Sequence, residues 1–355
     1  MVRASNVRQA GLWAAVVGLV LVLVLVTRPR THLEEGDALR GPVRALSGLQ
    51  RAPPEPLLQP NQLVVDGGSV AVHQEGRCSH ARWEEGLPPL YIITPTYPRA
   101  EQLAELTRTA QTLMNIPNVV WIVSEDAVEA TPAVTNYLNE SDLHTVYLRV
   151  QMPSKYQKER NKPRGVANRM AGLNWVRENA KDGVLYFADD DNTYDIRIFE
   201  QMRWTRKVSM FPVGLVTKLG VSTPIVKDGK VLGFYDGWIA KRKFPIDMAG
   251  FAVNVQYLLE RPLAAMPYKV GYEEDGFMKS LGIKASEIEP LAFNCTKIWV
   301  WHTQTKKNEP ASPVIQNNAT IGSNLDIIKE QLWKGPGTKQ NTKTKMRSKR
   351  AQDGS

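Results

Sequence analysis

The stretch GVLYFADDDNTY, residues 183–194, decides the fold class. Its apolar and aromatic run over 184–188 is typical of a buried strand in a parallel α/β sheet. The run ends at three adjacent carboxylates, Asp189, Asp190 and Asp191. Ligands bind at the carboxyl ends of such strands, and adjacent anions repel one another unless a cation or donors hold them. A divalent cation that also contacts a substrate phosphate is the simplest explanation. An acidic turn that caps the next helix would equally explain three adjacent aspartates.

Elements on both sides of this strand alternate as in a doubly wound sheet. Upstream, we expect strands at 90–93, before 124–126 and at 145–150, with helices at 103–114 and from about 163. Downstream, the pattern predicts a hairpin at 224–234, a turn and helix over 247–259, and a last strand at 297–300. The sequence therefore predicts an α/β fold with a mostly parallel sheet that becomes mixed, or is joined by a smaller sheet.

The charge of the chain lies at its two ends. The net charge is +9, of which residues 1–30 supply +4 and residues 336–355 supply +5, so the 305 residues between them are neutral. A basic groove for nucleic acid is not indicated. The basic end, 312–355, is predicted to be a disordered polar tail. The 43% hydrophobic content leaves room for a sizeable core.

The amino-terminal region has the pattern of a membrane anchor. Residues 10–26 form a run without charge, with arginines on both sides and no small-residue cleavage pattern after it. We predict an uncleaved signal anchor there, a cytoplasmic tail at 1–9 and a lumenal, Pro- and Gly-rich stem at 27–86. Sequons at Asn139, Asn294 and Asn318 agree with a lumenal orientation. Two cysteines do not make a disulfide framework.

Three further features could carry chemistry. A lysine-rich loop at 151–164 leads into a helix whose first turns carry Arg164 and Arg169, a pattern that suits an anion but also an ordinary solvated charge run. GYEEDG at 271–276 places Glu274 near a helix start, where it could be a general base or only a favourable helix-end charge. His302 ends a short apolar strand, and a lone histidine there is more often structural.

Eight motifs in order give a specific resemblance. They are PTYPR (95–99), SEDA (124–127), PRGVANR (163–169), YFADDDNTY (186–194), MRWTRKVSMFPVGLV (202–216), FPIDMAGFAV (244–253), GYEED (271–275) and NCTKIWVWHT (294–303). Over residues 87–305 the chain resembles the β-1,3-glucuronyltransferases of glycosyltransferase family 43. The resemblance implies a catalytic domain of GT-A type at 87–311, with a UDP-binding half at 87–195 and an acceptor-binding half at 196–311.

The resemblance also implies an activity and residue roles. It predicts a homodimeric, single-pass type II Golgi enzyme that transfers glucuronic acid from UDP-glucuronate to the 3-hydroxyl of a terminal galactose, with inversion and with Mn²⁺. Glu274 matches the general base and Asp191 the metal ligand, while Arg242 and Asp247 match contacts to the sugars. The nucleotide-binding positions correspond to Thr96, Tyr97, Arg99, Asp126, Arg164, Arg169, Asp189, Asp190 and His302.

Two departures from the family pattern concern the acceptor. Ser222 stands where linker-specific members carry a glutamate, and Gln304 follows His302 where an arginine is common. The acceptor is therefore left open between Gal-Gal-Xyl linkers and N-acetyllactosamine. Two other classes are alternatives: a different UDP-sugar transferase on the same fold, such as a pentosyltransferase, and a non-catalytic glycan-binding or scaffold protein.

Overall fold

The computed structural model describes residues 63–65, 69–71, 74–75, 82–312, 314, 317–318 and 320–333. These residues all belong to one compact unit, Pro56–Ser355. The predicted cytoplasmic tail and anchor, 1–26, and most of the predicted stem lie outside the described residues. In the part of the chain that is described, no helix has the length and apolar character needed to cross a membrane.

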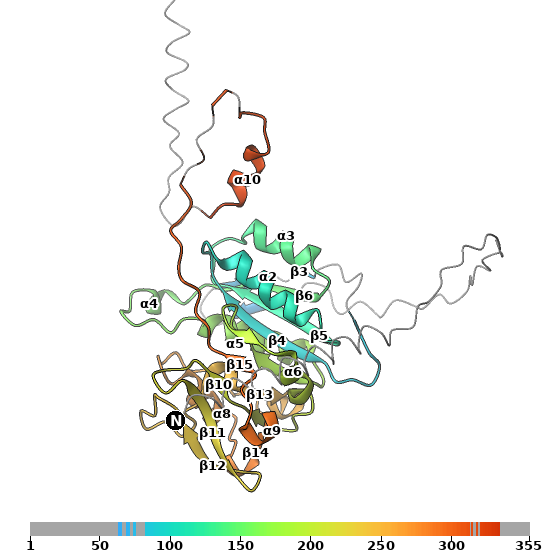
Figure 1. Ribbon diagram of the computed structural model, residues 1–355, viewed down its shortest axis with the longest axis vertical. Helices are drawn as coiled ribbons and strands as arrows, with labels where there is room; N and C mark the ends of the chain where they lie inside the picture. The colour runs from blue at the N-terminus through green and yellow to red at the C-terminus, as the bar shows by residue number, and fades with distance from the viewer. Residues whose placement is uncertain are drawn as a thin grey trace, which may run out of the picture. The chain divides into compact units, whose positions relative to one another are not determined.

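The centre of the fold is an eight-stranded sheet (Figure 1). Its strands are β3 (Gln74–Glu75), β4 (Leu90–Thr96), β5 (Val119–Glu125), β6 (His144–Arg149), β7 (Val184–Phe187), β9 (Val208–Met210), β13 (Phe251–Asn254) and β14 (Ile288–Pro290). Their spatial order is β14-β9-β13-β7-β4-β5-β6-β3. The four strands β7, β4, β5 and β6 are parallel neighbours, whereas β13 and β3 run antiparallel on either side of them. The predicted α/β fold class is confirmed.

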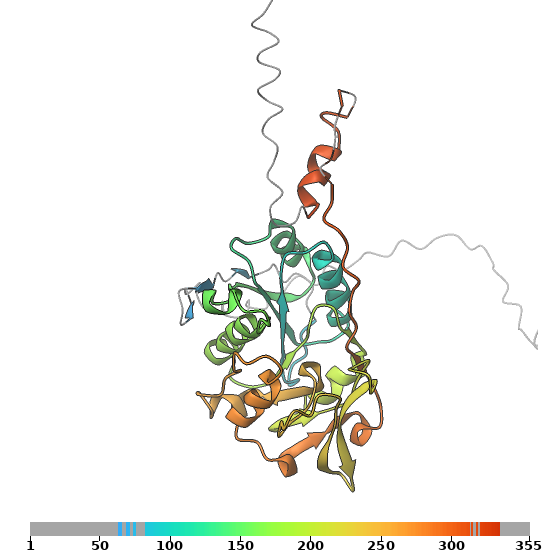
Figure 2. The ribbon, with the colours of Figure 1, turned by 90° about the vertical axis from the view of Figure 1, so that its left-hand side faces the viewer.

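The two faces of this sheet bury two separate cores. Along β7, Val184 and Tyr186 join one core while Leu185 and Phe187 join the other, as the period of two in a strand requires. Figures 1 and 2 show helices on both faces. The first core contains residues of α2 (Gln102–Leu113), α3 (Pro132–Glu140) and α6 (Ile196–Met202); the second contains residues of α5 (Val166–Asn179), α7 (Val255–Leu259) and α8 (Glu273–Ser280). Each buried Leu, Val or Phe side chain contributes about 1.5–3 kcal/mol.

A smaller, five-stranded sheet begins directly after the acidic turn. Its strands are β8 (Thr193–Tyr194), β10 (Val213–Gly214), β11 (Val221–Lys227), β12 (Lys230–Tyr235) and β15 (Val300–Trp301), in the order β12-β11-β10-β15-β8. The predicted hairpin is present as β11 and β12, with Asp228 and Gly229 at the turn in left-handed conformations. Because β7 belongs to the large sheet and β8 to the small one, the three aspartates lie where the two sheets meet.

Two expectations were wrong in detail. Residues 247–259 are not a turn and one helix: a 3₁₀ turn η1 (Met248–Gly250) leads into strand β13, and only then does α7 begin. Strand β13 lies between β7 and β9 and is buried on both faces, so its short apolar run carries no period that separates strand from helix. The last strand is Val300–Trp301 rather than 297–300.

Short elements complete the description. They are β1 (Leu63–Val65), β2 (Ser69–Ala71), α4 (Ser154–Gln157), η2 (Ala285–Glu287), α9 (Leu291–Cys295) and α10 (Leu325–Gln331). Strands β1, β2 and β3 lie within the segment predicted as stem, and α10 lies within the predicted polar tail. The domain boundaries at 87 and 311 remain predictions.

Candidate active site

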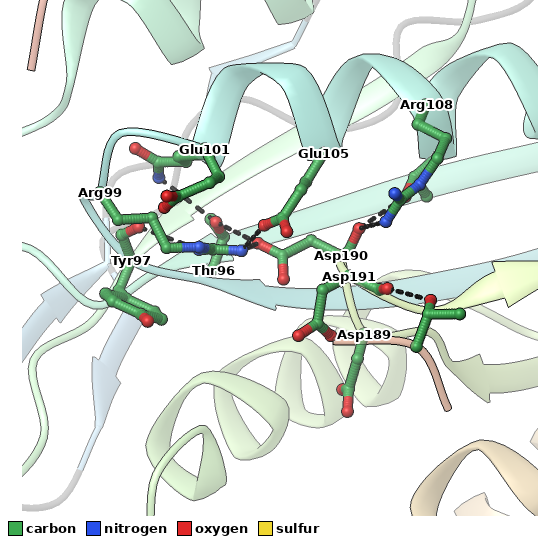
Figure 3. A network of polar contacts seen from close by, with 12 residues as sticks. Thr96, Tyr97, Arg99, Glu101, Glu105, Arg108, Asp189, Asp190 and Asp191 are labelled. Carbon is green, nitrogen blue, oxygen red and sulfur yellow. Dashed lines mark hydrogen bonds and ion pairs between the residues drawn. The ribbon is translucent and has the colours of Figure 1, made fainter. Parts of the chain in front are cut away.

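The three aspartates point in different directions and have different partners (Figure 3). Asp190 points toward helix α2 and is buried, and its Oδ2 atom lies 2.7 Å from Thr96 Oγ1 and 2.8 Å from Arg99 Nη2. Burial raises the pKa of Asp190 to about 6, although Arg99 and Thr96 act in the opposite direction. The same Arg99 nitrogen pairs with Glu105. Asp190 is thus a structural anion that joins the ends of β4 and β7.

Asp189 pairs with Arg169 in the first turn of α5. Burial alone would lower the pKa of Arg169, but the charge of Asp189, and more weakly those of Glu274 and Glu273, raise it overall. Gly165 makes room for this pair: a Cβ atom there would lie 2.5 Å from Arg169 Nη1. Its φ of +74° is also one that glycine adopts readily.

Asp191 differs from its two neighbours. Among the described residues its carboxylate has no hydrogen bond or ion pair, while its backbone carbonyl accepts from the Thr303 hydroxyl. Burial and the neighbouring charge of Asp189 raise the pKa of Asp191, so a cation would stabilise its ionised form.

A divalent cation could be held here by the Asp191 carboxylate together with the phosphates of a bound substrate. No group of three or more His, Cys, Asp or Glu side chains in the described part of the chain forms a metal cage. Mg²⁺-like ions are commonly held by one or two carboxylates together with substrate phosphates. Asp191 therefore fits a metal that binds with a nucleotide better than a resident metal.

The acidic turn faces a cavity of about 890 Å³ at the carboxyl ends of β4, β5 and β7. Nine of the residues singled out in the sequence line it: Thr96, Tyr97, Arg99, Asp126, Arg164, Arg169, Asp189, Asp190 and Asp191. Tyr97 is 38% exposed, so its ring is available for stacking, and Arg99 lies 4.5 Å from the ring centroid. Asp126 accepts a hydrogen bond of 3.1 Å from Met152 N, and burial raises its pKa. The cavity thus has an aromatic surface, cations and carboxylates.

The sequence did not predict every part of this cavity. Lys162 of the lysine-rich loop lines it, and so do three residues that were not predicted: Glu105, Thr305 and Lys307. The last two belong to the strap, which we define as residues 303–308 and which follows β15 (Figure 2). At one end of the strap, Thr303 contacts the acidic turn; at the other, Asn308 Nδ2 donates a hydrogen bond of 2.8 Å to Glu101 Oε1. Motif spacing could not reveal this wall, because Asn308 lies 207 positions beyond its hydrogen-bond partner Glu101.

The other predicted residues form a second cluster outside the lining of this cavity. Glu274 lies in the first turn of α8, and Arg242 Nη1 lies 3.7 Å from Glu274 Oε2. Burial raises the pKa of Glu274 to about 7; Asp247 and Glu273 act in the same direction and Arg242 in the opposite one. A half-buried carboxylate with such a pKa can accept a proton near neutral pH.

Asp247 and His302 lie in contact in the same cluster. His302 Nδ1 lies 3.2 Å from Asp247 Oδ2, an ion-pair contact that is not aligned as a hydrogen bond. The contact with Asp247 raises the pKa of His302 to about 9, and Asp189 and Asp191 act in the same direction. Ser222 is fully buried, and its Oγ accepts a hydrogen bond of 3.1 Å from Asp247 N. The residue that departs from the family pattern therefore supports Asp247.

The predicted glycosylation positions differ in exposure. Asn294 and Asn318 are exposed, whereas Asn139 is half-buried near the end of α3. Their use remains a prediction.

Comparisons with known proteins agree with the motifs. The sequence profile of Glycosyltransferase family 43 matches residues 109–306. Galactosylgalactosylxylosylprotein 3-beta-glucuronosyltransferase P of Drosophila melanogaster is 60% identical over 247 residues, which are 69% of this chain and 51% of that protein. The S protein of the same species is 51% identical over 249 residues, covering 68% and 61% of the two chains.

The likeness extends to mammals. Human galactosylgalactosylxylosylprotein 3-beta-glucuronosyltransferase 2 is 46% identical over 236 residues, 63% of this chain and 72% of that protein. The matched region spans less than two thirds of either Drosophila relative. More than half of the chain falls within the family profile, which includes the three aspartates and Glu274, whereas Thr96, Tyr97 and Arg99 precede it. The chain belongs to glycosyltransferase family 43.

Proposed function

We propose that the protein is an inverting glucuronosyltransferase that moves glucuronic acid from UDP-glucuronate to the 3-hydroxyl of a terminal galactose. One observation carries the proposal: a nucleotide-sized cavity is lined by Asp191, whose carboxylate has no partner among the described residues, and it is accompanied by a second cluster with the half-buried carboxylate of Glu274. The names of the relatives support the glucuronosyl donor and a galactosylgalactosylxylosyl acceptor.

In this proposal the donor nucleotide lies in the cavity at the carboxyl ends of the strands. Tyr97 and Asp126 hold the uracil end, while Arg164 and Arg169 face the phosphates and the carboxylate of the sugar. Planar guanidinium groups suit both anions, which favours a uronic acid over a neutral sugar. Asp191 would hold Mn²⁺, which when bound supplies Lewis-acid stabilisation of the leaving diphosphate.

The acceptor sugar lies beside Glu274 in this proposal. Glu274 removes the proton of the galactose 3-hydroxyl as that oxygen forms a bond to C1 of glucuronate. The bond from C1 to the diphosphate breaks, its electron pair leaves with UDP, and the configuration at C1 inverts. Arg242 and Asp247 contact the sugars and hold the two reacting atoms near one another.

The cellular setting is also part of the proposal. The uncharged run at 10–26 and the sequons favour a type II membrane protein of the Golgi with a lumenal catalytic domain. Homodimer formation is expected from the family resemblance alone. We propose the Gal-Gal-Xyl linker as the first acceptor to test because the names of the relatives specify it.

Transfer by the purified full-length chain tests this function. UDP-glucuronate is supplied with Gal-Gal-Xyl or with N-acetyllactosamine, with and without Mn²⁺, and the product linkage is determined by NMR. The expected product carries β-1,3-linked glucuronate and depends on Glu274, so Glu274→Gln is inactive while it still binds UDP. Transfer from UDP-xylose but not UDP-glucuronate would replace the proposed donor. UDP binding without any transfer would favour a glycan-binding role.

A further inference from the structure

A loop next to the proposed base is held in a costly conformation. We define the acceptor loop as residues 236–244; it carries Trp238, which is 56% exposed, and Arg242. Within it, Ala240 and Lys241 have φ of 39° and 58°. Residues with a side chain enter this region at a cost, so contacts outside the loop must hold the conformation.

Asp275 supplies such contacts from helix α8. Its Oδ1 atom accepts hydrogen bonds of 2.7 Å from Lys243 N and 2.9 Å from Phe244 N, at the end of the acceptor loop. Its Oδ2 atom pairs with Lys279 Nζ at 2.5 Å. Asp275 is 1% exposed, and although burial alone would raise its pKa, Lys279 and the two backbone donors lower it overall. The lowered pKa keeps this buried carboxylate ionised, and both of its oxygens have hydrogen-bond or ion-pair partners.

The other end of the acceptor loop is held by hydrogen bonds between residues of the loop. Asp236 Oδ1 accepts from Trp238 N at 2.6 Å and from Arg242 Nη2 at 3.0 Å. These contacts orient Arg242 relative to the loop but do not attach the loop to helix α8. Attachment to the helix comes from Asp275, from a hydrogen bond of 3.2 Å that the Tyr272 hydroxyl donates to Ala240 O, and from the longer contact between Arg242 and Glu274.

Adjacent positions of α8 thus have separate tasks. Successive residues of a helix project about 100° apart, so Glu274 and Asp275 face different neighbours. Glu274 lies 3.7 Å from Arg242 Nη1, while Asp275 holds the backbone that follows Arg242. The distance between the base and this arginine depends on the attachment of the loop.

We propose that Asp275 is a positioning residue of the transfer reaction: by fixing the acceptor loop to helix α8, it sets the place of Arg242 beside Glu274 and of Trp238 beside the acceptor. This inference rests on the proposed function, because it assigns Glu274 as the base and the loop as part of the acceptor site. Asp275 itself touches neither substrate.

Three variants of the full-length protein separate this role from a general effect on folding. Asp275→Ala removes the two backbone hydrogen bonds and the ion pair, Asp275→Asn keeps an oxygen for the two backbone donors, and Lys279→Ala removes only the ion pair. We expect Asp275→Ala to raise the acceptor KM about tenfold and to change the donor KM less than about twofold. Asp275→Asn and Lys279→Ala should stay within about threefold of the natural protein.

The pH profile gives a second readout. Charged groups that act on Glu274 are Asp247, Glu273, Arg242 and Arg169, and Arg242 opposes the rise in its pKa. A released loop moves Arg242 away, so the acid limb of kcat/KM should shift to higher pH in Asp275→Ala and stay in place in Lys279→Ala.

Limited trypsin digestion reports the attachment without any assay of activity. Lys241 and Lys243 are exposed, so cleavage at 241–243, mapped by mass spectrometry, should be faster in Asp275→Ala than in Asp275→Asn. Equal losses in the Ala and Asn variants, a donor KM that rises with the acceptor KM, or an unmoved acid limb would overturn the role of Asp275. Absence of transfer in the unaltered protein would instead reject the proposed function, while the digestion result would still test the attachment.

Discussion

Arg99 Nη2 lies 2.8 Å from Asp190 Oδ2, and the same nitrogen pairs with Glu105. The side chains of Asp190 and Glu105 are only 8% and 3% exposed, and that of Arg99 is 10% exposed. One cation therefore neutralises two buried carboxylates, one at the end of β7 and one on α2. The contact joins the nucleotide cavity to the core of the large sheet.

Loss of this cation should be costly to stability. Arg99→Ala leaves Asp190 and Glu105 buried without their shared partner, so we expect the free energy of unfolding to fall by about 3 kcal/mol. The matched control is Arg197→Ala: the Arg197 side chain is 59% exposed in its pair with Asp195, so its loss should change stability by less than about 1 kcal/mol. Urea denaturation measures both. Similar small losses in the two variants would contradict a shared buried cation.

Gly165→Ala should affect the donor site as well as the backbone. The left-handed φ costs about 1–2 kcal/mol for alanine, and the new Cβ also displaces the Arg169 guanidinium. Gly229→Ala is the control, because Gly229 has a φ of +71° with nothing within 4 Å of a Cβ. We expect similar losses of stability but a higher Kd for UDP-glucuronate only in Gly165→Ala, as calorimetry can measure. Equal Kd values would show that Arg169 tolerates the added methyl group.

Activity should rise with pH through the titration of Glu274. Its carboxyl, with a pKa of about 7, is mostly protonated at pH 6 and mostly ionised at pH 8, so kcat/KM should increase over this interval. Stability should change in the opposite sense. Between pH 4.5 and 7 the folded state holds a proton that the unfolded state has lost, so the free energy of unfolding falls as pH rises.

Glu274→Gln checks both parts of this expectation. It should abolish transfer and also reduce the fall in Tm between pH 5 and pH 8, because the glutamine cannot ionise. A variant Tm that falls as steeply as that of the natural protein would assign the titration to another group.

Asp191→Asn should remove the metal dependence of nucleotide binding. The neutral amide is a weak ligand for a hard cation, so titration of Mn²⁺ should no longer strengthen UDP binding. Binding in the presence of a chelator should remain close to that of the natural protein. Asp195→Asn is the control, since Asp195 caps α6 and pairs with Arg197. A metal response that survives in Asp191→Asn would place the cation on another residue.

The sequence was informative where its signal was long or chemically distinctive. Strands β4, β5 and β7 have apolar runs that end in polar residues, and the nine motif residues around the cavity were named from the sequence and its resemblance. Strand β13 was missed because its three buried residues and the half-buried Asn254 carry no period of their own. Glu105 was missed because an acidic residue on a helix gives no sign that it faces a buried arginine.

The acceptor side was harder for the same physical reason. The partly buried hydrogen bond between Asp247 and Ser222, and the attachment of Lys243 to Asp275, join residues that lie 25 and 32 positions apart. No local pattern records such pairings. The acidic triplet at 273–275 was recognised, but which carboxylate faces which neighbour depends on the packed structure.

The late position of the strap in the sequence determines when the cavity is completed as the chain is synthesised. Residues 95–191 contribute most of the cavity early in the chain, yet Thr305 and Lys307 emerge only after β15 has been made. A nascent chain that ends at residue 301 could bury both cores and still lack one wall of the cavity that we propose to bind the nucleotide. Nucleotide capture would then be among the last properties the polypeptide acquires, and a UDP analogue would recognise finished molecules in preference to prematurely ended ones.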